Sequence, residues 1–236
     1  MNFSFSFMLT ALRAAASKIP VTVTLAIFPL LIGLVLGLLI ALARFFNVRV
    51  LAFIFRWLVT IVKGIPVVLL LLVFYVVTAN VYDSLMADLG LPLTFKDLNK
   101  AVIAVAALSV YSSIGLSEVF RGALASVKKG QYDAGFAVGL TKFQVLRRIV
   151  LPQAIPVSLP MMCNILIALT KAVALASMVA VVDVMSAAVI AATGNYRFLE
   201  AYVAAAIVYW GICLVIERVF AALEKISARA VRDTAL

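Results

Sequence analysis

The chain has 236 residues, of which 66% are hydrophobic and 13% charged, and it carries a net charge of +10. A soluble domain is nearer half apolar and a quarter charged, so this composition excludes an ordinary soluble protein and predicts one surrounded mainly by lipid. The basic residues flank apolar runs, which the positive-inside bias of membrane proteins explains better than nucleic-acid binding does.

The sequence offers little for metal or redox chemistry. It contains no histidine, which removes the commonest metal ligand and the usual proton shuttle. Its two cysteines, Cys163 and Cys213, stand alone in apolar runs without a C-x-x-C spacing. We interpret both as buried small hydrophobic residues rather than a disulfide or a metal pair, and we predict no catalytic residue, no metal site and no cofactor bound by this chain.

Five apolar stretches between successive charges are suited to cross the hydrocarbon core of a membrane, which takes about 20 residues per helix. They are residues 19–43, 64–82, 101–117, 149–170 and 201–216. We expect the second span to extend backwards through residues 57–62, across the single charge of Lys63. An amphipathic segment within residues 1–18 precedes the first span.

The apolar stretch that follows the fourth span is interrupted by polar residues. Asp183, Gly194 and Asn195 divide residues 172–196. We therefore interpret segment 183–196 as a short helix that dips into the membrane without crossing it.

Charge sets the expected orientation. With five crossings, segments 44–50, 119–148 and 218–236 share one side and carry twelve Lys and Arg residues, against five on the other side. The positive-inside rule then puts the N-terminus outside and the C-terminus in the cytoplasm. The first apolar run is too long for a signal peptide and Arg44 follows it, so we expect it to stay in the mature protein.

The longest hydrophilic segment lies within residues 119–150 and predicts a helix, a glycine turn and a second helix. We expect Asp133 in the first turn of the first helix, where the helix dipole favours a carboxylate, and a left-handed Gly139 at its end. Thr141 and Gln144 form a T-x-x-Q capping box for the second helix. A stripe of Tyr132, Phe136, Leu140, Phe143, Arg147 and Val150 by itself favours an alternative, a helix lying on lipid headgroups.

The detailed pattern of this segment favours a different interpretation. Gly130-Gln131-x-Asp133-Ala134-Gly135-x-x-x-Gly139, followed by Ile149-Val150-Leu151-Pro152, closely resembles the EAA motif of type I ATP-binding-cassette (ABC) importer permeases. In that family the loop is a coupling helix that docks in a cleft of the ATPase subunit. The resemblance therefore implies an ATPase-coupling role for Gln131, Tyr132, Asp133, Ala134 and Gly139. Asp133 stands where Glu is commonest, and Gly135 stands where the family has a second Ala.

Further motifs extend this resemblance over most of the chain. Lys63-Gly64-Ile65-Pro66, Glu118-x-x-Arg121-Gly122-Ala123 and Leu151-Pro152-Gln153-Ala154 are similar to motifs of the polar amino-acid branch, the histidine/glutamine/cystine-type permeases. The resemblance implies one all-α transmembrane permease domain over residues 1–236, in the bacterial inner membrane. It also implies three partners, namely a cytoplasmic ABC ATPase dimer, a second permease copy or homologue, and an extracytoplasmic amino-acid-binding protein. The chain has no G-x-x-x-x-G-K-[ST] phosphate loop, so ATP and Mg are expected in the partner subunit.

Ionisable residues inside a span are functional candidates, because leaving them unpaired in lipid is costly. We predict substrate binding by the polar residues of span four, Asn164, Thr170, Lys171 and Ser177, with Lys171 pairing with an amino-acid carboxylate. Alternatively Lys171 snorkels or pairs with an acid elsewhere. Lys63, Glu118 and Arg121 lie near cytoplasmic helix ends, and we assign them a gate or structural role.

The expected substrate class rests on a difference between this chain and the usual family sequence. The family usually reads Lys-Asp-Thr-Ser-Leu where this chain has Lys171-Ala172-Val173-Ala174-Leu175. Without the aspartate, helix four offers no anionic group to a cationic substrate. We therefore expect a neutral, acidic or zwitterionic amino acid such as cystine.

Two alternatives from other classes remain. An intramembrane enzyme needs a catalytic set such as H-E-x-x-H, and none is present. An ion- or proton-coupled transporter acting without an ATPase needs acids deep in the membrane, and Asp183 is the only candidate. Separately, Gly33-x-x-x-Gly37 predicts close helix packing, within the chain rather than across a dimer.

Overall fold

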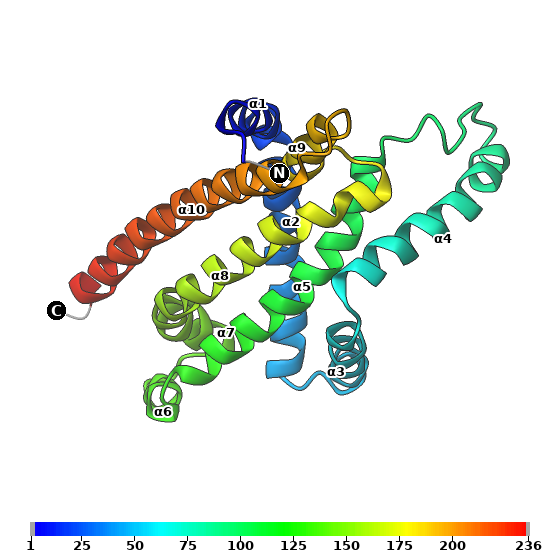
Figure 1. The fold of residues 1–236 in the computed structure, drawn as a ribbon. Coiled ribbons are helices and arrows are strands. Elements are labelled where there is room, and N and C mark those ends of the chain that lie inside the picture. Colours follow the sequence, from blue (N-terminus) through cyan, green and yellow to red (C-terminus); the bar gives the residue numbers. More distant parts are fainter. Residues whose placement is uncertain (1–2, 235–236) are drawn as a thin grey trace.

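The computed structural model describes residues 3–234, with side chains described for residues 3–228. Every regular element in this part of the chain is helical (Figure 1). Five helical stretches are long and apolar enough to cross a membrane: α2 (Ile19–Phe45), α4 (Val67–Asp88), α5 (Lys100–Ser126), the continuous run Lys142–Val179, and residues Phe198–Ala228 of α10 (Phe198–Thr234). The predicted all-α, five-span membrane fold is confirmed.

The centre of the bundle is the contact between α2 and α5. A Cβ on Gly33 would collide with Ser112 Oγ, and a Cβ on Gly37 would lie 2.9 Å from the backbone oxygen of Ser113. The two backbones can therefore approach only because both positions are glycine, which confirms the predicted packing within the chain. Ser112 Oγ also donates a hydrogen bond to the Pro29 carbonyl at 2.5 Å.

The second span is shorter than expected, because residues 57–62 belong to a separate helix. The amphipathic α3 (Arg49–Gly64) ends before Ile65, which is extended at φ −93° and ψ 123°. Pro66 disfavours a helical conformation at the residue before it, so the chain breaks and α4 begins at Val67. Figure 1 shows α3 turned away from the direction of α2, at the end of the bundle where α6 (Lys129–Ala137) also lies.

The fourth span changes helix type along its length. It runs from α7 (Lys142–Val145) through the π-helical turn η1 (Leu146–Val150) and α8 (Leu151–Val173) to the 3₁₀ turn η2 (Ala174–Val179). The π turn ends two residues before Pro152, whose nitrogen cannot donate a helical hydrogen bond.

The next helix, α9 (Val184–Ala192), has nine residues. It is too short to cross a membrane, as expected for this segment.

The last span is much longer than the expected stretch 201–216, because α10 continues without interruption for 37 residues. The N-terminal α1 (Phe5–Ala16) buries Ala11 and Ala15 in a cluster shared with α9 and α10. Glu200, one of the charges expected to bound this span, instead accepts hydrogen bonds from the Ser4 backbone and from Arg197, both at 3.0 Å. It thereby ties the beginning of α1 to the beginning of α10.

Candidate transport and coupling sites

The hydrophilic segment folds as a helix, a glycine turn and a helix, as predicted. Gly139 adopts the left-handed conformation at φ 82°. Thr141 Oγ1 accepts from the Gln144 backbone at 3.3 Å while Gln144 Oε1 accepts from the Thr141 backbone at 2.8 Å, which completes the capping box. The expected placement of Asp133 is wrong, because α6 begins at Lys129 and Asp133 is its fifth residue, beyond the first turn. Residues 119–126 of the segment belong to α5.

One face of α6 is fixed to its own chain. A Cβ on Gly135 would lie 2.8 Å from a methyl of Val145 and 2.9 Å from Ile149 Cδ1, so the glycine permits a close approach that alanine would obstruct. Tyr132 packs beside Phe45 and donates from its hydroxyl to the Leu124 carbonyl at 3.0 Å. Burial raises the pKa of the Tyr132 phenol, which therefore stays neutral at physiological pH.

The other face of α6 is exposed. Gln131, Asp133 and Ala134 are all solvent-accessible in the isolated chain. The expected aromatic stripe divides, because Tyr132 and Leu140 pack inward while Phe136 and Phe143 point outward with exposed fractions of 45% and 67%. An exposed group of large apolar side chains beside polar ones is typical of a protein interaction surface.

A single carboxylate joins the helices α2, α3 and α5. Glu118 on α5 contacts Arg44 at the end of α2 at 2.5 Å, Arg121 on α5 at 3.1 Å and Lys63 at the end of α3 at 3.6 Å. The structure thus brings together the three residues assigned a gate or structural role. Sequence reasoning missed Arg44 as a fourth member, because its position after an apolar run indicated only the end of a span.

The polar residues of span four do not form one group. Asn164 and Lys171 are exposed and lie seven residues apart in a continuous helix, so they share one face of α8. Ser177 is exposed in the 3₁₀ turn beyond them. Thr170 is fully buried, and its hydroxyl donates to the Leu166 carbonyl at 2.8 Å.

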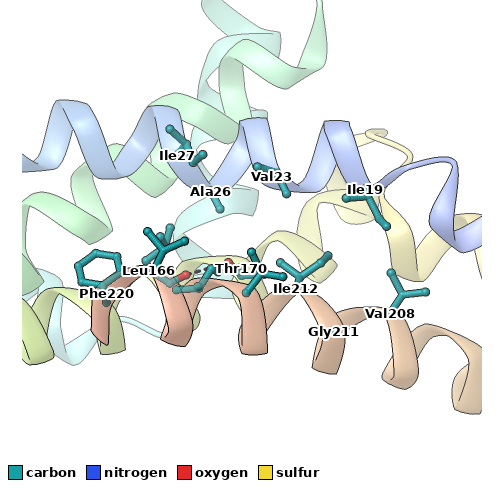
Figure 2. A pocket seen from close by; sticks show the side chains of 13 residues that line it. Ile19, Val23, Ala26, Ile27, Leu166, Thr170, Val208, Gly211, Ile212 and Phe220 are labelled. Atoms are coloured by element: carbon teal, nitrogen blue, oxygen red, sulfur yellow. Dashed lines mark hydrogen bonds between the residues drawn. The ribbon is translucent and has the colours of Figure 1, made fainter. Parts of the chain in front are cut away.

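Thr170 lines an apolar cavity of about 500 Å³ between α2, α8 and α10. Figure 2 shows side chains of α2 and α10, among them Val23 and Ile212, facing each other across this cavity. Apart from Thr170, its lining offers no polar side chain. A charged ligand would lose its hydration there without gaining partners, so this cavity is a poor site for an amino acid.

Asp183, the acid that an ion-coupled mechanism would need, is held by hydrogen bonds within the fold. Asp183 is fully buried at the N-cap of α9 and accepts from the backbones of Met185 and Ser186 at 3.1 and 3.0 Å. The Tyr209 hydroxyl donates to the same carboxylate at 2.5 Å. These bonds give the buried carboxylate a structural role as the N-cap of α9, which explains its position without an ion-coupling function.

Comparison with known proteins identifies the class. Residues 33–226 match the family model described as binding-protein-dependent transport system inner membrane component. The probable amino-acid permease protein YxeN of Bacillus subtilis (strain 168) is 33% identical over 218 residues, which cover 91% of each chain. The L-cystine transport system permease protein TcyB of the same organism is 34% identical, over 86% of this chain and 82% of the relative.

A solved structure shares the fold. The chain superposes on one described as an amino acid ABC transporter with histidines with a TM-score of 0.80, at 24% identity, over 95% of this chain and 99% of that one. The protein therefore belongs to the family of binding-protein-dependent transport system inner membrane components. It is a multi-pass permease subunit of an ABC importer, and the alternative of an ion-coupled transporter is not supported.

Proposed function

We propose that this chain passes an amino acid across the bacterial inner membrane, from an extracytoplasmic binding protein to the cytoplasm, driven by a separate ATPase dimer that binds ATP and Mg. Membership of the permease family carries the proposal, and the relatives named for amino acids support it. The chain itself catalyses no reaction. The exposed face of α6, with Gln131, Asp133 and Ala134 beside Phe136, is the surface that takes the ATPase, and Gly139 sets its angle.

The substrate path runs along the exposed face of α8 that carries Asn164 and Lys171, and a second permease copy or homologue closes it from the other side. Within residues 3–228 Lys171 forms no ion pair, which leaves it available to a substrate carboxylate. Ser177 lies further along the same path, while Thr170 supports the helix from its buried side. A cationic substrate would bring a second positive charge close to Lys171, which costs several kcal/mol at low dielectric. The substrate is therefore a neutral, acidic or zwitterionic amino acid such as cystine.

Uptake by the importer reconstituted with its ATPase and binding protein tests this function. Lys171→Ala should lower the uptake of a zwitterionic amino acid about tenfold or more, because a charge-assisted hydrogen bond to the carboxylate is lost. Lys63→Ala is the matched control, since it removes the same charge from the end of α3, where Glu118 pairs with it, and should have a smaller effect. High-affinity arginine uptake that is unaffected by Lys171→Ala would contradict the substrate class. Uptake without any ATPase subunit would contradict the importer assignment.

A further inference from the structure

The helix α3 presents an apolar face that no part of the described chain covers. Val59 and Val62 pack the helix against the bundle in a cluster with Ile40 of α2 and Ile114 of α5, and Ala52 is also buried. A separate, broader face carries large side chains that are 50% to 67% exposed: Val50, Phe53, Ile54, Trp57 and Ile61. Such a surface is too apolar to face water.

A row of cations borders this apolar face. Arg49, Arg56 and Lys63 are spaced seven residues apart, which places them on one side of the helix. Lys63 is engaged by Glu118, whereas within residues 3–228 Arg49 and Arg56 are exposed and form no ion pair. A helical-wheel projection at 100° per residue puts this row about 115° from the middle of the apolar face, between that face and the side that packs on the bundle.

The position of α3 fits the boundary between lipid and water. The helix follows α2, a full membrane span, and turns away from its direction (Figure 1). Its last turn carries Lys63, which pairs with Glu118. Its 16 residues measure about 24 Å, which is shorter than the hydrocarbon core. A helix with a broad apolar face, a tryptophan and a separate basic row has the pattern of one that lies in the plane of the interface.

We propose that α3 is an interfacial helix that binds anionic phospholipid in the leaflet on the side of α6. Its apolar face enters the acyl chains beside Trp57, and Arg49 and Arg56 bind the phosphates of the headgroups. A second copy of the chain would also cover the apolar face, but it would not explain a cationic row at seven-residue spacing along its border. The leaflet accounts for both features.

The two tryptophans of the chain, Trp57 and Trp210, allow a direct test. The full-length permease with Trp210→Phe retains only Trp57 and is reconstituted in equimolar phosphatidylcholine and phosphatidylglycerol, with bromine on one lipid at a time. Trp57 fluorescence should be quenched more strongly by bromine near the headgroup than by bromine near the chain end. It should also be quenched more strongly by brominated phosphatidylglycerol than by brominated phosphatidylcholine.

Charge removal then separates lipid recognition from simple insertion. Arg49→Gln with Arg56→Gln should abolish the preference for phosphatidylglycerol, since each lost charge weakens association with an anionic surface roughly fivefold, and should leave the depth unchanged. Arg218→Gln with Lys225→Gln removes two charges from α10 and should leave the preference intact. A Trp57→Phe variant reports on Trp210 and should be quenched best by deep bromine.

Three results would overturn the proposal. No quenching of Trp57 by either lipid would mean that protein, such as a second copy, covers the apolar face. Equal quenching by the two lipids would remove the anionic recognition. Stronger quenching by deep bromine would mean that α3 is embedded rather than interfacial.

Discussion

The contacts of Glu118 show how unequal three ion pairs on one carboxylate can be. Arg44 is 15% exposed and its guanidinium lies 2.5 Å from the carboxylate, whereas Lys63 is 53% exposed and lies 3.6 Å away. An exposed pair gains little because water and salt screen it, while a shielded, charge-assisted hydrogen bond keeps its strength. The two cations also fix different helices to α5, namely α2 and α3.

We therefore expect Arg44→Met to lower the free energy of unfolding by about 2 kcal/mol and Lys63→Met to change it little. The thermal unfolding midpoint of the purified permease in detergent is the measurement, with both variants matched in size and charge lost. A larger loss for Lys63→Met would contradict the ranking of the two contacts.

At the scale of elements, the turn between α6 and α7 sets the orientation of α6, the helix that we propose docks on the ATPase. Gly139→Leu places a branched side chain at φ 82°, which is strained for any residue with a Cβ, and Asp133→Lys reverses a charge on the exposed face. Both variants should abolish ATP-driven uptake and leave the amount of inserted permease largely unchanged. Gly130→Ala is the control, because that glycine is helical and has open space around it. Wild-type uptake by either coupling variant would exclude the assigned role of α6.

The turn and the cap around α6 and α7 could be predicted from the sequence, whereas counting between charges misplaced the bounds of two spans because it ignores helix breakers. The capping box of Thr141 and the left-handed Gly139 follow from a few adjacent residues, and both are confirmed. The second span does not extend backwards across Lys63, because the chain breaks at Ile65 before Pro66, so residues 57–62 belong to α3. Counting between charges also shortened the last span, since a helix without glycine or proline after Glu217 continues past the membrane.

In the candidate sites, contacts between residues far apart in the sequence could not be predicted. The ion pair of Arg44 with Glu118 joins residues 74 positions apart, so no local pattern could reveal it. Similarly, Thr170 and Lys171 are neighbours in sequence, yet one is buried and the other exposed, because successive residues point about 100° apart around a helix. Predicting which of them is buried required knowledge of where α2 and α10 pack.

On the scale of the whole molecule, the basic residues are distributed unevenly between the two ends of the bundle. The turns at α3 and α6 lie at one end, whereas α1, α9 and the connection between α4 and α5 lie at the other (Figure 1). The excess of basic residues on the side of α6 favours a cytoplasmic location for that end.

Site-specific labelling in intact cells tests this orientation. In a background with Cys163→Ala and Cys213→Ala, a membrane-impermeant maleimide should label Lys96→Cys and should not label Lys142→Cys until the membrane is opened. Both native lysines are exposed, so accessibility within the fold does not bias the comparison. The reverse labelling pattern would invert the proposed topology and remove α6 from the reach of a cytoplasmic ATPase.

The tight contact between α2 and α5 also has a genetic consequence. Every amino-acid replacement of glycine adds at least a Cβ, and at Gly33 and Gly37 that single carbon already overlaps α5. In a saturation library selected for uptake, both codons should therefore be recovered almost only as glycine. Gly122, a helical glycine with no atom within 4 Å of an added Cβ, should accept alanine and serine in the same selection. Two glycine codons 12 bases apart would thus mark, in sequencing data alone, where the two helices touch.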